Sequence, residues 1–148
     1  MEERFMLMAI EEAKKALELD EVPVGAVIVK NGIVIAKSFN TKERDQLVTK
    51  HAELNVIEEA SLKLNNWRLN GCDIYVTLEP CPMCASAIKQ SRISHLYYGL
   101  SNRDQNNKTI IYSILEKDFS NPAVEVSCGY FSFEIEKLMN SFFRAKRD

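Results

Sequence analysis

Two cysteines in one short segment offer the clearest chemistry in this sequence. Residues 78–87 read LEPCPMCASA, so Cys81 and Cys84 stand three positions apart, directly behind a proline. On the first turn of a helix, side chains at this spacing face the same side, and the positive end of the helix dipole favours thiolates. The pair is therefore suited either to a metal ion or to a redox disulfide.

A histidine earlier in the chain favours the metal. His51 opens the motif His-Ala-Glu well before the cysteines, whereas a thioredoxin-like pair would follow the first strand of a βαβ unit and need no distant partner. One imidazole nitrogen and two thiolates make three ligands for a tetrahedral zinc ion, and a remaining open position is typical of a catalytic site. His95, the other histidine, lies in an apolar strand and is interpreted as a packing residue.

Glu53 gives the open position a use. On a regular helix it would point about 200° away from His51, so both side chains can face one metal only where the chain enters its helix. There Glu53 can accept a proton from a zinc-activated water and deliver it to a nitrogen of the substrate. The pattern His-x-Glu followed by Pro-Cys-x-x-Cys is the signature of zinc nucleobase deaminases, and it predicts hydrolytic deamination.

Hydrophobic spacing and turn residues predict the elements that must position these groups. The Asn31-Gly32 pair between two β-branched runs indicates a hairpin, and Pro82 is placed to begin a helix. Residues 40–50 read as a polar loop. Strands are predicted at 25–30, 33–37, 73–78, 93–98 and 124–128, and helices at 2–19, 51–64, 82–90, 110–117 and 133–147.

This order of elements predicts an α/β fold. Helices between the later strands favour a five-stranded mixed sheet covered on both faces, a three-layer α/β/α sandwich. Because sites in open α/β sheets gather beyond the carboxyl ends of strands, we expect the helix starts at His51 and Cys81 to converge there.

Length and composition indicate a globular protein of one domain. The chain has 148 residues, 46% of them hydrophobic and 27% charged, which is enough to bury roughly 70% of the unfolded surface in one core. We expect a single domain over residues 1–148. No window approaches the roughly 20 apolar residues of a membrane span, and the start MEERFM does not resemble a signal peptide. We therefore expect a cytoplasmic protein without membrane contact, in which a stable disulfide is disfavoured.

The charge is unevenly distributed along the chain. A net charge of −2 argues against a protein that coats nucleic acid with a broad basic face. Residues 137–148, however, carry four cations against one acid. From the residues alone this segment is either a solvated helix end that suits the helix dipole or a binding surface.

Nearly the whole chain resembles the bacterial tRNA-specific adenosine deaminases, in the cytidine deaminase-like superfamily. The similar segments include the zinc motifs, Asn66-Trp-Arg-Leu69 and Ser141-Phe-Phe-Arg144, and the last two distinguish the tRNA branch from free-base deaminases. The resemblance implies deamination of adenosine to inosine at the anticodon wobble position of tRNA. It also implies a homodimer that binds the tRNA anticodon stem-loop.

The resemblance also implies roles for individual residues. His51, Cys81 and Cys84 would bind one zinc ion per subunit, and Glu53 would transfer the proton. The remaining roles concern the substrate: Asn40 would bind the target base, Ala26, Glu79 and Pro80 would line its pocket, and Phe143, Arg144, Lys146 and Arg147 would lie near the anticodon loop.

One segment departs from the family pattern, and two other functions remain open. Residues 100–110, which follow Gly99, lack the usual glycines after the fourth strand, so we expect a different loop beside the pocket. One alternative is a free-base deaminase acting on guanine or cytosine, which shares the zinc signature. The other is a zinc-stabilised binding module without turnover. No role is predicted for Cys72 or Cys128, which are interpreted as buried, reduced residues.

Overall fold

The computed structural model describes residues 2–147 and is built around a five-stranded sheet. Its strands are β1 (Gly25–Lys30), β2 (Ile33–Phe39), β3 (Cys72–Leu78), β4 (His95–Leu100) and β5 (Glu125–Cys128). They lie in the order β2-β1-β3-β4-β5. β1 is antiparallel to β2 and β3, whereas β3, β4 and β5 are parallel. The sheet is therefore mixed, as predicted.

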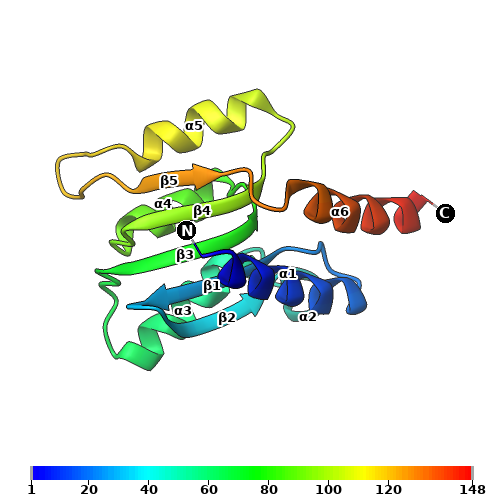
Figure 1. The fold of residues 1–148 in the computed structure, drawn as a ribbon, viewed down its shortest axis with the longest axis horizontal. Coiled ribbons are helices and arrows are strands. Elements are labelled where there is room, and N and C mark those ends of the chain that lie inside the picture. Colours follow the sequence, from blue (N-terminus) through cyan, green and yellow to red (C-terminus); the bar gives the residue numbers. More distant parts are fainter. Residues whose placement is uncertain (1, 148) are drawn as a thin grey trace.

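Helices cover both faces of this sheet (Figure 1). One face carries α1 (Glu3–Glu18) and the first part of α6 (Ser132–Arg147); the other carries α3 (Ala52–Leu64), α4 (Pro82–Gln90) and α5 (Gln105–Leu115). The short α2 (Lys42–Asp45) lies between β2 and α3. The end of α6 projects past the sheet. This arrangement confirms the predicted three-layer α/β/α sandwich.

The two helical layers pack on opposite sides of the same strands. Val27 and Tyr75 contact the α1 side, whereas Ile28 and Ile74 contact the side of α3 and α4. Successive side chains of a strand point to opposite faces, so both sets become buried when both faces are covered. The central strands β1, β3 and β4 consequently have no exposed positions. The loops that leave the ends of these strands are therefore attached to a buried, well-packed sheet.

Two local predictions agree with the backbone. Asn31 and Gly32 adopt φ values of 53° and 75°, as the predicted two-residue hairpin turn requires. Gly25 begins β1 where α1 passes closely, and a Cβ at this position would clash with the carbonyl oxygen of Ala9. The glycine thus lets the first helix lie directly on the sheet.

The largest differences from the predictions lie at α2, at α5 and at β4. The predicted loop 40–50 contains α2. The helix predicted at 110–117 begins at Gln105, because the Asp104 carboxylate accepts the Asn106 N–H at 2.9 Å and caps the helix earlier. The fourth strand begins at His95 rather than residue 93, since the chain is still turning at Arg92, where φ is 67°.

Candidate active site

The starts of α3 and α4 bring the predicted metal ligands together. His51 is the N-cap of α3, and Cys81 is the N-cap of α4; both have extended backbones, with ψ of 152° and 170°. Cys84 lies one turn into α4, where Pro82 occupies the first turn at no hydrogen-bonding cost. The three ligand atoms all lie within 4.8 Å of one another. The predicted convergence is therefore present in the structure.

The spacing of these atoms fits a tetrahedral ion. The Nδ1 atom of His51 lies 3.5 Å from Sγ of Cys84 and 3.8 Å from Sγ of Cys81. Zinc bonds of about 2.3 Å to sulfur and 2.0–2.1 Å to nitrogen, at the tetrahedral angle, place such atoms about 3.6 Å apart. The set supplies three ligands, which leaves one position of a tetrahedral ion for another molecule.

Hydrogen bonding and burial give the two cysteine thiols different pKa values. Donation from Cys84, and then from His51, lowers the pKa of the Cys81 thiol to about 4, although burial opposes this shift. The same hydrogen bond, together with burial, raises the pKa of the Cys84 thiol. A bound metal ion would hold both as thiolates. The Cys81 thiol is thus the more acidic of the two.

Glu53 faces the same space as His51 although it lies on the first turn of α3. Its side chain is buried, and both residues line one cavity. Burial raises the pKa of Glu53 to about 7. A carboxyl group with a pKa near neutrality is suited to both accepting and donating a proton. The extended backbone of His51 permits this shared orientation, as predicted.

The cavity has a volume of about 670 Å³, within the range of small-molecule sites. Its polar wall joins two of the metal ligands, His51 and Cys81, to residues from four connections of the chain, while Val22, Val24 and Leu78 provide apolar surface. The other residues that line it are Leu19, Asp20, Glu21, Asn40, Lys42, Glu43, Arg44, Ala52, Glu79, Asn102, Phe142 and Lys146.

Of the residues predicted to bind or surround the base, Asn40 lies at the cavity and Ala26 does not. Asn40 lines the cavity, where its Nδ2 donates to the Val22 carbonyl at 3.4 Å and its Oδ1 accepts the Lys42 N–H at 3.3 Å. Ala26 does not line it. That residue is fully buried in the core on β1, so Val24, just before the strand, occupies the position on the wall instead.

Comparisons with known proteins identify the family of this chain. The sequence pattern of the MafB19-like deaminase family matches residues 1–147. The tRNA-specific adenosine deaminase of Bacillus subtilis (strain 168) is 42% identical over 146 residues, which cover 99% of this chain and 91% of that protein. The chain belongs to the tRNA-specific adenosine deaminase family.

Solved structures extend this relationship. One, from a study of A-to-I editing by tRNA:A34 deaminases at the wobble position, is 41% identical to this deaminase with a TM-score of 0.83, covering 91% of this chain and 98% of that one. A guanine deaminase from Bacillus subtilis is 28% identical with a TM-score of 0.67, covering 99% and 94%. The fold is thus shared with free-base deaminases, but the sequence is closer to the tRNA branch.

Glu79 and Pro80 are held by a residue that sequence reasoning missed. Asn107 is buried, and its Nδ2 donates to Oε2 of Glu79 at 2.7 Å and to the Pro80 carbonyl at 3.2 Å. The other carboxylate oxygen of Glu79 has no hydrogen-bond partner among residues 2–147. Glu79 lines the cavity, as predicted, whereas Pro80 is not among its lining residues, so that prediction was wrong for Pro80. Asn107 lies in the segment without glycines after Gly99. That departure from the family pattern was the only feature of the sequence that could have drawn attention to this residue.

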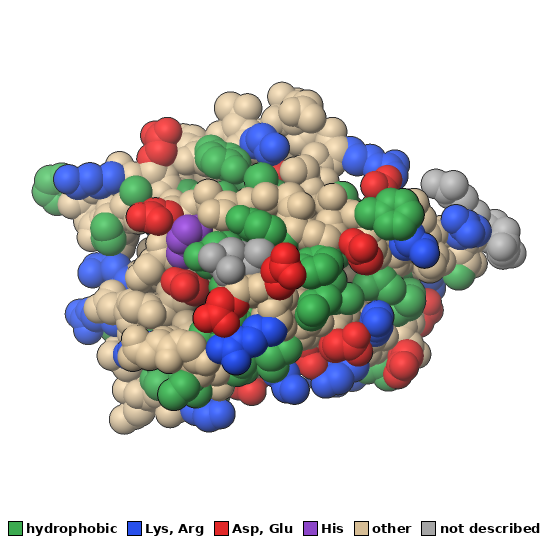
Figure 2. All heavy atoms as spheres, in the orientation of Figure 1, with side chains coloured by type: hydrophobic (Ala, Val, Ile, Leu, Met, Phe, Trp, Pro, Cys, Tyr) green, Lys and Arg blue, Asp and Glu red, His purple; other side chains and the backbone are tan. Residues whose placement is uncertain are grey.

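The end of α6 contributes to two neighbouring cavities. Phe142 and Lys146 line the main cavity, and Lys146 donates to Asp20 at 2.6 Å. Phe143 and Arg144 line a second cavity of about 470 Å³ that shares Leu78 and Asn102 with the first. The side chain of Arg147 lies outside the described part of the structure. Figure 2 shows acidic and basic groups interspersed over the face of the deaminase that carries α1 and α6.

The remaining expectations concern the other cysteines and the membrane. Cys72 is buried, but Cys128 is exposed because β5 lies at the edge of the sheet; the prediction that both are buried was wrong for Cys128. Within the described residues of this deaminase, no helix combines the length and apolar character needed to cross a membrane.

Proposed function

We propose that this chain catalyses the zinc-dependent hydrolytic deamination of adenosine to inosine at the wobble position of a tRNA anticodon. The observation that carries this proposal is the 42% identity to a tRNA-specific adenosine deaminase over almost the full chain. The converging ligands and the buried Glu53 beside them support it, because they provide the groups that hydrolytic deamination needs.

His51, Cys81 and Cys84 would hold the zinc ion. When bound at such a three-ligand site, zinc activates water for attack on the ring carbon that carries the amino group. Glu53 would accept one proton of the attacking water and transfer it to the ring nitrogen. It would then take the second proton from the hydroxyl that has added to the ring carbon and deliver it to the amine, which departs as ammonia. Its pKa of about 7 suits both transfers.

Asn40 and Glu79 would bind and orient the base within the cavity. The supporting observation is that both side chains belong to its wall and are themselves held by neighbours. The apolar surface of Val22, Val24 and Leu78 would limit water there. Fixed polar groups in such a space orient a substrate without further reorganisation.

Cations on α6 would bind the RNA backbone around the target base. Arg144, Lys146 and Arg147 are proposed for this role, and Phe143 is proposed to lie beside them near the anticodon loop. Phe143 and Arg144 line the second cavity, and Lys146 lines the main one. Neutralisation of phosphates by such groups supplies affinity that falls with salt. We further propose that residues 1–148 form one domain, that the protein is a homodimer, and that it acts on tRNA in the cytoplasm.

Guanine deamination is the second candidate function. The structural similarity to a guanine deaminase at 28% identity favours it, because the two proteins share a fold along almost their full lengths. A free base would also fit within a cavity of about 670 Å³. The higher identity to the tRNA enzymes places this candidate second.

One substrate comparison distinguishes the two functions. Purified, zinc-loaded protein is incubated with an anticodon stem-loop that carries adenosine at the wobble position, and separately with free guanine, cytosine and adenine. Inosine in the RNA without ammonia from the free bases is the expected result. Ammonia from a free base with unmodified RNA would refute the tRNA activity.

A further inference from the structure

Glu21 is a fully buried carboxylate that none of the roles above uses. It lies in the connection between α1 and β1 and lines the main cavity. Buried carboxylates are costly unless they accept hydrogen bonds or pair with a cation. The partners of Glu21 therefore indicate what its charge stabilises.

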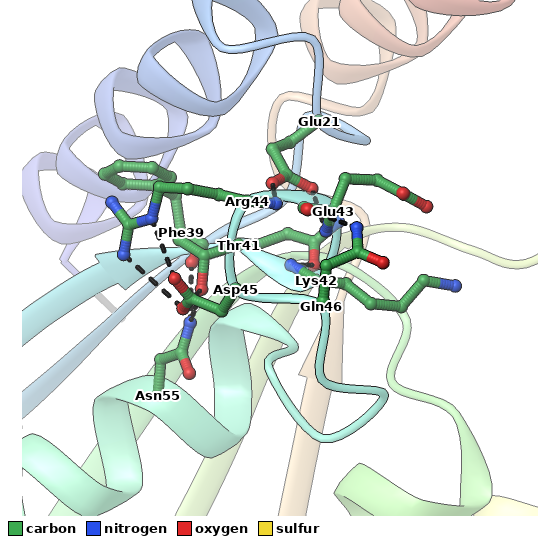
Figure 3. A network of polar contacts seen from close by, with 10 residues as sticks. Glu21, Phe39, Thr41, Lys42, Glu43, Arg44, Asp45, Gln46 and Asn55 are labelled. Atoms are coloured by element: carbon green, nitrogen blue, oxygen red, sulfur yellow. Dashed lines mark hydrogen bonds and ion pairs between the residues drawn. The ribbon is translucent and has the colours of Figure 1, made fainter.

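These partners are two consecutive backbone amides of α2. One carboxylate oxygen of Glu21 accepts the Glu43 N–H at 3.0 Å, and the other accepts the Arg44 N–H at 2.7 Å. Figure 3 shows the carboxylate above the start of this short helix. N–H groups in the first turn of a helix have no partner within the helix. One side chain thus satisfies two such donors and holds α2 against the α1–β1 connection.

The same two segments hold Asn40. Its backbone N–H donates to the Val24 carbonyl at 3.1 Å, and its side chain lies between the Val22 carbonyl and the Lys42 N–H. The amide of Asn40 is therefore fixed from both segments. If α2 moved away from Glu21, the Lys42 N–H would move with it and the Asn40 amide would lose one of its two contacts.

A second set of bonds connects this segment to α3. Asn55 donates through Nδ2 to the Phe39 carbonyl at 2.9 Å and to the Thr41 hydroxyl at 3.1 Å, and Thr41 donates to Asp45 at 2.8 Å (Figure 3). Since α3 also carries Glu53 and follows His51, the segment is linked to the metal site on one side and to Glu21 on the other.

We propose that Glu21 is a positioning residue for substrate binding. By holding α2 through its two amides, it fixes Asn40 in the cavity and thereby sets the affinity for the base, while the metal ligands and Glu53 are left in place. The inference rests on the proposed function for its substrate, but the hydrogen bonds it depends on are independent of the reaction.

The test is E21Q, which keeps the shape of the side chain. The NH₂ group of the glutamine would face one of the two backbone N–H groups, so that hydrogen bond is lost. The second hydrogen bond would have a neutral oxygen as its acceptor in place of a charged carboxylate oxygen. Hydrogen exchange of the Glu43 and Arg44 amides should become at least about tenfold faster. KM for the substrate that the wild type deaminates should rise by about tenfold, with kcat and zinc content changed less than about twofold.

Two further variants control this experiment. E12Q makes the same change at a buried carboxylate of α1 that pairs with Lys15 and does not line the cavity, so it should leave KM and the α2 amides unchanged. E21D keeps the charge and should fall between the wild type and E21Q. It also provides the measurement if E21Q does not fold.

The outcomes separate this inference from the proposed function. The inference would be overturned if E21Q had the same amide exchange rates and the same KM as the wild type. If only E21D folds, the same comparison is made with E21D. An equal fall in kcat, or loss of zinc, would also overturn the inference, because Glu21 would then support the metal site rather than substrate binding. A wild type that deaminates none of the substrates refutes the proposed function, whereas amide exchange still decides whether Glu21 holds α2.

Discussion

Nδ1 of His51 lies 3.5 Å from Sγ of Cys84, although 33 positions separate the two residues in the chain. The contact exists because α3 and α4 lie on the same face of the sheet and both begin at the same end of its strands. Replacing Cys84 with serine should therefore remove most of the bound zinc and abolish activity, since a serine hydroxyl is a poor zinc ligand. Elemental analysis of purified protein measures this, and full zinc occupancy in C84S would contradict the assignment. C72S, at a buried cysteine outside the ligand set, is the matched control.

Glu53 should be needed for turnover but not for zinc. Glu53→Gln keeps the size of the side chain and removes its ability to accept a proton, so kcat should fall by roughly 10²–10⁴-fold while zinc content is unchanged. Measurement of both quantities on the same sample separates proton transfer from metal binding. A variant that keeps zinc and full activity would refute the assigned role of Glu53 in proton transfer, whereas a wild type that binds zinc without any turnover would favour the zinc-stabilised binding module.

Asn107 should stabilise the turn that leads into Cys81. Asn107→Ala leaves the Glu79 carboxylate and the Pro80 carbonyl without their donor, and this should lower the free energy of unfolding by about 2 kcal/mol. Asn106→Ala makes the identical change one position earlier at an exposed side chain, so it should stay within about 0.5 kcal/mol of the wild type. Urea denaturation compares the two. Equal destabilisation would show that helix propensity, not the contact to the turn, is responsible.

His95 should make stability depend on pH. Its ring stacks on Tyr97 with centroids 3.9 Å apart, and burial lowers its pKa below 6.5, although Asp73 and Glu125 oppose the shift. The folded protein thus binds this proton less tightly than the unfolded chain does. The stability contributed by neutral His95 is fully present above pH 6.5 and is lost as pH falls through the lower, folded pKa.

A His95→Phe variant tests this dependence, because phenylalanine keeps a stacking ring and does not titrate. The free energy of unfolding, measured in urea from pH 8 down to pH 5, should fall more steeply for the wild type than for the variant. His51 is present in both proteins, so its own titration cancels in the difference. Parallel curves would exclude a contribution from His95.

Arg144 should contribute to RNA binding through a phosphate. Arg144→Ala is expected to weaken binding of the anticodon stem-loop and to reduce the slope of log affinity against log salt by about 1. Lys63, at the far end of α3 from His51, is an exposed cation for a matched Lys63→Ala control. A salt slope that is unchanged in the Arg144 variant, or reduced equally in both variants, would indicate that Arg144 does not bind a phosphate. The cations of α6 would then be interpreted as the solvated end of a helix.

Local signals in the sequence were sufficient for the framework of the site. The hairpin at Asn31 and the helix start at Pro82 depend on backbone preferences of neighbouring residues, so both could be predicted. The four-residue α2 was missed because it is too short to show hydrophobic periodicity. Its stability depends on Glu21, which lies 22 positions from the amide of Glu43. The start of α5 was missed because a single capping bond from Asp104 decides it.

The sequence by itself determined the kind of chemistry, since His51, Glu53, Cys81 and Cys84 reveal their use through residue type and spacing. Only the tertiary structure decided which other residues form the cavity. It placed Ala26 in the core, brought Glu21 to the wall of the cavity, and brought the buried Asn107 into contact with Glu79 of that wall. A carboxylate or an amide is an ordinary hydrogen-bonding group with no motif of its own. Its role follows from partners that are distant in the chain and become neighbours only when the sheet and its helices have packed.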